Sequence, residues 1–193
     1  MTPLQEVLRR AATDLDDMGY GWALIGGLAV SARSQPRFTA DVDLAVAVSD
    51  DAAAEALAHA LRHRGWKIDT AVEQDAVGRL ATVRLLGDEN ASPVVDLLFA
   101  SSGLEREIVD DAEVLELFPD QRIPVARLGH LIALKLLARG EDRPQDAVDL
   151  QALAAVAEPD DLATARAAVE LIQRRGFARG RDLQGALAGL SVR

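Results

Sequence analysis

Three aspartates in strand-like segments are the residues best suited to do chemistry. Asp41 and Asp43 lie two residues apart in the valine-rich segment 41–48, and alternate residues of a strand point to the same face. Asp96 interrupts the otherwise apolar segment 93–100. Aspartate is unfavourable in strands, neighbouring like charges repel, and a buried carboxylate is costly unless it is paired or binds a metal. We therefore expect Asp41, Asp43 and Asp96 to bind Mg²⁺ (or Mn²⁺), which prefers hard oxygen ligands.

Two neighbouring features strengthen this interpretation. Gly26 and Gly27 follow the apolar segment 22–25, so a phosphate can approach the backbone N–H groups at the start of the next helix. The face that carries the aspartate pair continues with Ala45 and Ala47, whose small side chains leave room for a ligand. The aspartate pair alone is a weak signal, because strand-end acids that face water occur by chance in acidic chains. Together, these features favour metal-assisted attack of a hydroxyl on a nucleotide phosphate, with pyrophosphate leaving.

The elements that must position these residues change character along the chain. Helices and strands alternate up to about residue 126, and only helices follow. We therefore expect an α+β (mixed α/β) fold, with an α/β core over residues 1–126 and a helical C-terminal subdomain over residues 127–193 that completes one cleft. Helices are predicted over residues 4–18, 28–34, 51–64, 128–138, 145–156, 161–174 and 181–190, strands over residues 22–25, 41–48, 66–70, 80–86, 93–100, 114–118 and 122–125, and a turn-rich link over residues 87–92.

Composition excludes several classes of function. The chain has no cysteine, which rules out disulfides, thiolate catalysis and cysteine-based metal sites. No apolar run approaches the ~18–20 residues that span a bilayer, and no signal peptide is visible, so we expect a cytoplasmic protein without membrane contact. The formal net charge of −10 argues against a protein that binds nucleic acid over a broad surface.

Positive charge is nevertheless concentrated near the C-terminus. From residue 162 onward, six arginines stand against two acidic residues. This pattern predicts either an ordinary solvated helical face or a basic rim that meets a polyanion. The arginines are Arg166, Arg174, Arg175, Arg179, Arg181 and Arg193.

Several motifs resemble those of a known group of enzymes. Gly26-Gly27-Leu28-Ala29, Arg37-x-Thr39-x-Asp41-Val42-Asp43-Leu44 and Val95-Asp96-Leu97-Leu98 resemble the DNA polymerase β-like nucleotidyltransferase superfamily. The elements Lys135-Leu136-Leu137-Ala138 and Arg143-x-x-Asp146-x-x-Asp149-Leu150 resemble the AbiEii/AbiGii family of toxin nucleotidyltransferases, which includes the MenT toxins. The resemblance covers roughly residues 20–155. Superfamily members often have serine where this chain has Gly27, so one hydroxyl donor to the triphosphate is absent.

The resemblance implies a polymerase β-like core, in which helices flank a mixed sheet, followed by a C-terminal helical bundle. It implies that Asp41, Asp43 and Asp96 are catalytic metal ligands. It also implies a set of residues that bind the NTP, namely Gly26, Gly27, Arg37, Thr39, Lys135 and Arg143.

Three of these roles have alternatives. From the residues alone, Lys135 on an apolar helix would extend its amine to water, whereas the resemblance places it at the β- and γ-phosphates. Asp146 and Asp149 are both catalytic candidates, and we favour structural pairing of Asp146 with Arg143 or Arg37. Arg37 would either contact a phosphate or base, or hold Asp41.

The expected activity is transfer of NMP from an NTP to an acceptor hydroxyl, with Mg²⁺ as cofactor. The resemblance implies that the acceptor is the tRNA 3′ end and that the protein is the toxin of a toxin–antitoxin pair, with a cognate antitoxin protein as partner. The alternatives are a protein or small-molecule (aminoglycoside-like) hydroxyl acceptor, a catalytically inactive nucleotide-binding module, and metal-dependent phosphate hydrolysis. The sequence leaves the NTP and the oligomeric state open.

Overall fold

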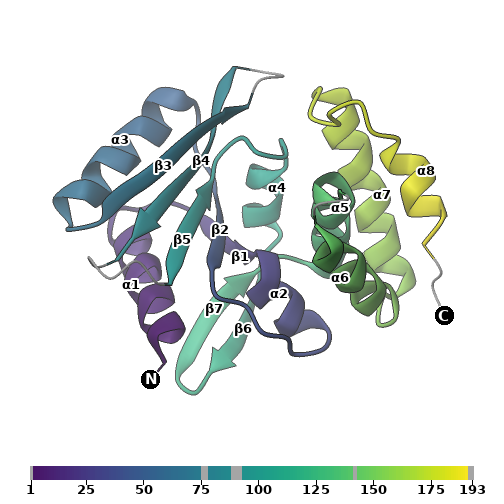
Figure 1. The fold of residues 1–193 in the computed structure, drawn as a ribbon, viewed down its shortest axis with the longest axis horizontal. Helices are drawn as coiled ribbons and strands as arrows, with labels where there is room; N and C mark the ends of the chain where they lie inside the picture. Colours follow the sequence, from purple (N-terminus) through teal and green to yellow (C-terminus); the bar gives the residue numbers. More distant parts are fainter. Residues whose placement is uncertain (1, 75–77, 88–92, 141–142, 191–193) are drawn as a thin grey trace.

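The computed structural model describes residues 2–74, 78–87, 93–140 and 143–190. Within these residues, seven strands form one mixed sheet, and helices α5 to α8 stand beside it (Figure 1). The predicted mixture of helices and strands is confirmed, and every described strand precedes residue 126. The helices are α1 (Pro3–Asp17), α2 (Gly26–Arg33), α3 (Asp51–His63), α4 (Glu105–Asp110), α5 (Leu128–Ala138), α6 (Pro144–Ala154), α7 (Pro159–Arg174) and α8 (Leu183–Ala188), and the strands are β1 (Trp22–Ile25), β2 (Val42–Val46), β3 (Lys67–Gln74), β4 (Arg79–Leu86), β5 (Val94–Leu98), β6 (Glu113–Phe118) and β7 (Gln121–Val125).

The strand order β3-β4-β5-β2-β1-β7-β6 places β2 and β5 at the centre of the sheet. These two strands are parallel, and their register sets Asp43 beside Asp96. Strand β4 pairs with β5 in the antiparallel direction and sets Arg84 beside Asp96. Three charged residues therefore stand side by side across β2, β5 and β4, because residues in register point to the same face.

The opposite face of the central strands forms the core. Val42 and Leu44 of β2 and Leu97 of β5 are at most 1% exposed. Helices α1 and α3 lie against this side of the sheet, and α4 and the C-terminal helices lie on the other side (Figure 1). This arrangement matches the predicted alternation, in which the valine and leucine positions supply core and the aspartates face the cleft.

Helix α4, which the sequence did not predict, covers part of the aspartate-bearing face. A side chain at Gly21 would come within 2.9 Å of Val109 in α4 and 4.0 Å of Ala47. Ala45 is fully buried. Ala45 and Ala47 do not line the cleft, so the room for a ligand on this face lies at Asp41 and Asp43.

Other differences concern boundaries. Strand β2 begins at Val42, so Asp41 lies in the loop before it, and β3 extends to Gln74 because β4 pairs with it along that length. Most of the predicted link over 87–92 lies outside the described residues. No helix in the described parts of the chain is long and apolar enough to cross a membrane.

Candidate active site

A cleft of about 620 Å³ lies between the central strands and helices α5 and α6. All but one of the residues predicted for the site line it, and the exception is Asp149. Those that line it are Gly26, Gly27, Arg37, Thr39, Asp41, Asp43, Asp96, Lys135, Arg143 and Asp146.

Asp43 is central to the acidic wall of this cleft. Burial, together with the neighbouring Asp96 and Asp41, raises its pKa from 3.8 to about 6, a value that already includes the partial offset by Lys135. Gly26 has a φ of +65°, and a Cβ there would overlap the Asp43 carboxylate. Glycine is therefore required at position 26, both for its backbone conformation and for the close approach of Asp43.

Asp96 is paired with an arginine that the sequence analysis did not single out. The Nε and Nη2 atoms of Arg84 donate to the two carboxylate oxygens of Asp96, at 2.8 and 2.7 Å. This bidentate ion pair compensates the carboxylate that we expected to need a metal. Among the described residues, no group of three or more His, Cys, Asp or Glu is placed to hold one metal ion together. The metal-binding role of Asp41, Asp43 and Asp96 stays a prediction.

The facing wall is organised around Lys135 of α5. Its ammonium lies 2.7 Å from Asp146 Oδ1 and 2.7 Å from Asp149 Oδ2. All three side chains are buried, with Lys135 only 9% exposed. The amine therefore does not extend into bulk water, as the alternative from the residues alone would require; two buried carboxylates of α6 hold it at the cleft.

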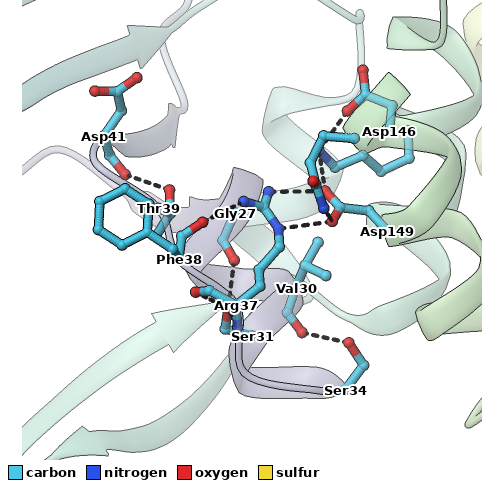
Figure 2. Close-up of polar contacts among 12 residues, drawn as sticks. Gly27, Val30, Ser31, Ser34, Arg37, Phe38, Thr39, Asp41, Asp146 and Asp149 are labelled. Carbon is cyan, nitrogen blue, oxygen red and sulfur yellow. Dashed lines mark hydrogen bonds and ion pairs between the residues drawn. The ribbon is translucent and has the colours of Figure 1, made fainter. Parts of the chain in front are cut away.

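Arg37 is held by Asp149, with Nε at 2.7 Å from Oδ1 and Nη2 at 2.9 Å from Oδ2 (Figure 2). This differs from the expectation that Arg37 holds Asp41 or pairs with Asp146. Of the two partners expected for Asp146, Arg143 pairs with it, at 3.1 Å. Although burial raises the pKa of Asp149, hydrogen bonds from Lys135, Gln145 and Arg37 lower it below its ordinary value.

These contacts separate the two acids of α6. Asp146 reaches the cleft, whereas Asp149 lies behind it and fixes Lys135 and Arg37. The geometry therefore favours a positioning role for Asp149, which the sequence analysis kept as a candidate base.

The glycine at position 27 has a local cause. A Cβ there would lie 2.7 Å from Arg37 Nη2 and 2.8 Å from Thr39 Oγ1. The side chains of Arg37 and Thr39 therefore occupy the space that a serine would need. Part of the polar surface that a serine would supply is replaced by Thr39 and the guanidinium.

The cleft-lining residues that were not predicted for the site include Phe38, Arg84 and Arg179. Arg84 is a charged residue in a largely apolar strand. Its position predicts that it faces the cleft only once the register that sets it beside Asp96 is known. Arg179, between α7 and α8, has a φ of 54° and donates to the Ser101 carbonyl at 2.9 Å. Of the six C-terminal arginines, Arg179 therefore reaches the cleft, and Arg193 lies outside the described residues.

Comparison with solved structures identifies the fold. An antigenic nucleotidyltransferase-like protein from Paracoccidioides brasiliensis is 20% identical, with a TM-score of 0.51 over 95% of this chain and 91% of that chain. The antibiotic-resistance factor ANT(2'')-Ia is 16% identical, with a TM-score of 0.50 over 95% of this chain and 94% of that chain. At these identities the likeness concerns the fold alone, and it confirms the predicted nucleotidyltransferase-like architecture. No curated protein matches the sequence.

Comparison with sequence families gives a match along nearly the whole chain. The family described as "Nucleotidyl transferase AbiEii toxin, Type IV TA system" matches residues 7–190. That span contains the Gly26–Gly27 turn, the aspartates of the acidic wall and the Lys135 network. The chain belongs to the AbiEii family of nucleotidyltransferases, the toxins of type IV toxin–antitoxin systems.

Proposed function

We propose that this nucleotidyltransferase transfers NMP from an NTP to the 3′-terminal hydroxyl of tRNA in a Mg²⁺-dependent reaction. The observation that carries the proposal is the pairing of two walls across one cleft. Asp41 and Asp43 lie on one wall, Lys135 and Arg143 on the other, and the Gly26 turn opens between them. Such an array suits a triphosphate, because Lys135 and Arg143 would attract it from one wall and a metal ion held by the aspartates would attract it from the other.

The backbone beside the aspartates supports phosphate binding. Helix α2 begins at Gly26, and Ile25 at its N-cap provides no side-chain hydrogen bond to the first turn. The N–H groups of a helix start lack intrahelical partners and favour anions. In our proposal these groups bind phosphate oxygens, and Lys135 and Arg143 bind the same phosphates from the facing wall.

The acidic wall fits a divalent cation in its donor chemistry. Its carboxylates supply hard oxygens and repel one another, as the raised pKa of Asp43 indicates. Asp41, Asp43 and Asp96 would hold the ion, and Arg84 would share or release the Asp96 carboxylate. When bound, Mg²⁺ would lower the pKa of the attacking hydroxyl and neutralise charge on the phosphates.

Transfer exchanges one bond at the α-phosphorus for another. The acceptor oxygen forms a bond to the α-phosphorus, the bond from that phosphorus to the bridging oxygen of the β-phosphate breaks, and pyrophosphate leaves with the electron pair. The hydroxyl proton passes to a carboxylate of the acidic wall. The chain's residues bind and orient both substrates, and Lys135 and Arg143 stabilise charge on the leaving pyrophosphate.

The direct test is incubation of the protein with Mg²⁺, total tRNA and each labelled NTP in turn. We expect label on tRNA with the wild-type chain and none with Asp43→Asn. Asp69→Asn is a matched control, since Asp69 is an exposed strand aspartate that does not line the cleft. Absence of label on RNA would reject the tRNA acceptor.

A second acceptor class has an observation in its favour. The net charge of −10 attracts cationic molecules, so a protein or aminoglycoside-like hydroxyl is the alternative. Label on protein or drug in the same assay would select it. A catalytically inactive nucleotide-binding module would leave growth inhibition intact in Asp43→Asn cells. We also propose a cognate antitoxin protein, whose co-expression should restore growth.

A further inference from the structure

Phe38 is an aromatic residue in an unusual position. Its side chain is 89% exposed, although it lines the cleft. Aromatic residues elsewhere in the described chain are mostly buried, including Trp22, Trp66, Phe99 and Phe177, each at most 7% exposed. Single exposed apolar residues are common on protein surfaces, but this one lines the cleft that contains the predicted site residues. The ring is therefore available to a ligand and contributes little to the core.

The loop that carries Phe38 is held in place by its neighbours. Arg37 is anchored to Asp149, and its Nη1 donates to the Phe38 carbonyl at 2.9 Å. The Arg37 N–H donates to Ser31 Oγ at 3.3 Å. The Arg37 side chain runs toward α6, whereas the Phe38 ring lies on the other side of the loop, below Asp41 (Figure 2). The exposed ring is thus presented by an anchored backbone, which reduces the entropy that a ligand must overcome.

Phe38 stands at one end of the cleft and Arg179 at the other. Along β2 and β5 the cleft passes Asp41, then Asp43 with Asp96, then Leu98, which is in register with Ala45. Asp41, just before β2, precedes that last position by four residues, or roughly 13 Å at about 3.3 Å per extended residue. Arg179 lies beyond the end of β5, at Ser101. The carboxylates therefore stand between an aromatic end and a cationic end.

Charge assigns the two ends to different substrates. Lys135, Arg143 and Arg179 all line the cleft, and Arg179 lies beyond the end of β5, so cations continue toward the Arg179 end. A triphosphate is favoured on that side. Arg37, the cation nearest Phe38, is paired with Asp149, whereas Arg179 at the other end is in no ion pair with a carboxylate of the described residues and donates to the Ser101 carbonyl. The aromatic end is thus left for a group that is recognised by stacking.

We propose that Phe38 is the platform on which the terminal base of the RNA acceptor stacks, so that its hydroxyl reaches the acidic wall. The inference rests on the proposed tRNA acceptor and adds how the strand end is held. Single-stranded RNA ends are recognised by stacking of unpaired bases on aromatic side chains, and this stacking tolerates different bases. A ring with so much of its surface exposed suits a strand that arrives from solvent.

The test compares Phe38→Ala, Phe38→Trp and a control, Val114→Ala. Val114 is a 54% exposed apolar residue on β6 that does not line the cleft. We expect Phe38→Ala to raise the KM for tRNA about tenfold, a loss typical of one stacking contact, and to leave the KM for NTP unchanged. Phe38→Trp should restore the KM for tRNA, and Val114→Ala should match the wild type. The midpoint of thermal unfolding should be the same in all four proteins.

A binding readout separates failure of the inference from failure of the proposed function. In the absence of NTP, tRNA should quench the fluorescence of the tryptophan introduced by Phe38→Trp, since the two native tryptophans are buried. If the wild type labels tRNA but Phe38→Ala keeps its KM for tRNA, or raises the KM for NTP equally, the stacking role is overturned and the function stands. If the wild type labels no RNA and tRNA leaves the fluorescence of the introduced tryptophan unchanged, both are overturned.

Discussion

Replacement of Asp43 by asparagine should stabilise the fold and abolish transfer. The charged form of Asp43 is unfavourable in the folded protein, because burial and the nearby Asp96 and Asp41 disfavour its charge. Asparagine has nearly the same shape and no charge, so it removes the repulsion while keeping the side chain against Gly26. Charged residues that an enzyme needs for activity often lower the stability of its fold, so removing one can stabilise the protein.

The magnitude follows from the pKa. Folding raises the pKa of Asp43 from 3.8 to about 6, which at about 1.4 kcal/mol per pKa unit corresponds to about 3 kcal/mol. The pKa of Asp43 is higher in the folded than in the unfolded protein. The wild type therefore has its full stability below the unfolded pKa of 3.8 and loses about this amount as the pH rises through about 6. Partial exposure to the cleft screens the charge, so we expect a gain of about 1–3 kcal/mol at about pH 7.5. At about pH 5 roughly half of that gain should remain.

Urea unfolding followed by circular dichroism measures this directly. Wild type, Asp43→Asn and the exposed-strand control Asp69→Asn would be compared at about pH 5 and about pH 7.5. We expect Asp69→Asn to stay within about 0.5 kcal/mol of wild type at both values. A variant at position 43 that is no more stable than wild type at the higher pH, or whose gain does not depend on pH, would refute the reasoning.

Three further outcomes follow from other contacts. Lys135→Met should destabilise the fold by about 3 kcal/mol in urea unfolding, because it leaves buried carboxylates uncompensated. The control is Lys67→Met, since Lys67 is an exposed lysine on β3. Equal unfolding midpoints for the two variants would contradict a buried ion network. Gly129→Ala should lower the stability by about 2 kcal/mol, since its Cβ would lie 2.7 Å from Thr164 Cβ and separate α5 from α7; an unchanged melting temperature would show that this packing is loose. Arg179→Ala should raise the KM for NTP about tenfold and spare the KM for tRNA, and the reverse pattern would exchange the two ends of the cleft.

Local signals predicted most of the secondary structure. Strand β1 and helix α5 have the expected bounds, because apolar segments with turn residues beside them need no long-range information. Helix α4 was missed because it is only six residues long and Leu104 at its N-cap makes no side-chain hydrogen bond. Its start is fixed instead by the buried Glu105, which accepts hydrogen bonds from the backbone of Ser101 and Ser102.

Strand β3 shows a different limit. Its side chains are nearly all exposed, so no alternation marks its length. The pairing of Glu73 and Gln74 with β4 extends the strand beyond the predicted residues. A register of this kind depends on a partner strand that the local sequence does not reveal.

The site was predictable where one segment carries the signal. The glycine turn, the aspartate pair and Lys135 each stand out from their own neighbours, and all line the cleft. The pairing of Arg84 with Asp96 was not predictable, because it depends on the antiparallel register of β4 and β5. Helical spacing placed Asp146 and Asp149 on one side of α6, but the packing of α6 against α5 decides which of them reaches the cleft.

The buried Asp149 connects two parts of the site that the sequence treated separately. One of its oxygens lies 2.7 Å from Lys135 Nζ, and the other lies 2.7 Å from Arg37 Nε. Lys135 belongs to the wall that we propose to bind the triphosphate, and Arg37 anchors the loop that presents Phe38. A single carboxylate with a lowered pKa thus fixes a phosphate-facing cation and the aromatic end of the cleft in one geometry. Because that carboxylate is already paired with cations, it is a poor proton acceptor, and in the proposed reaction it would keep both substrate contacts in place at once.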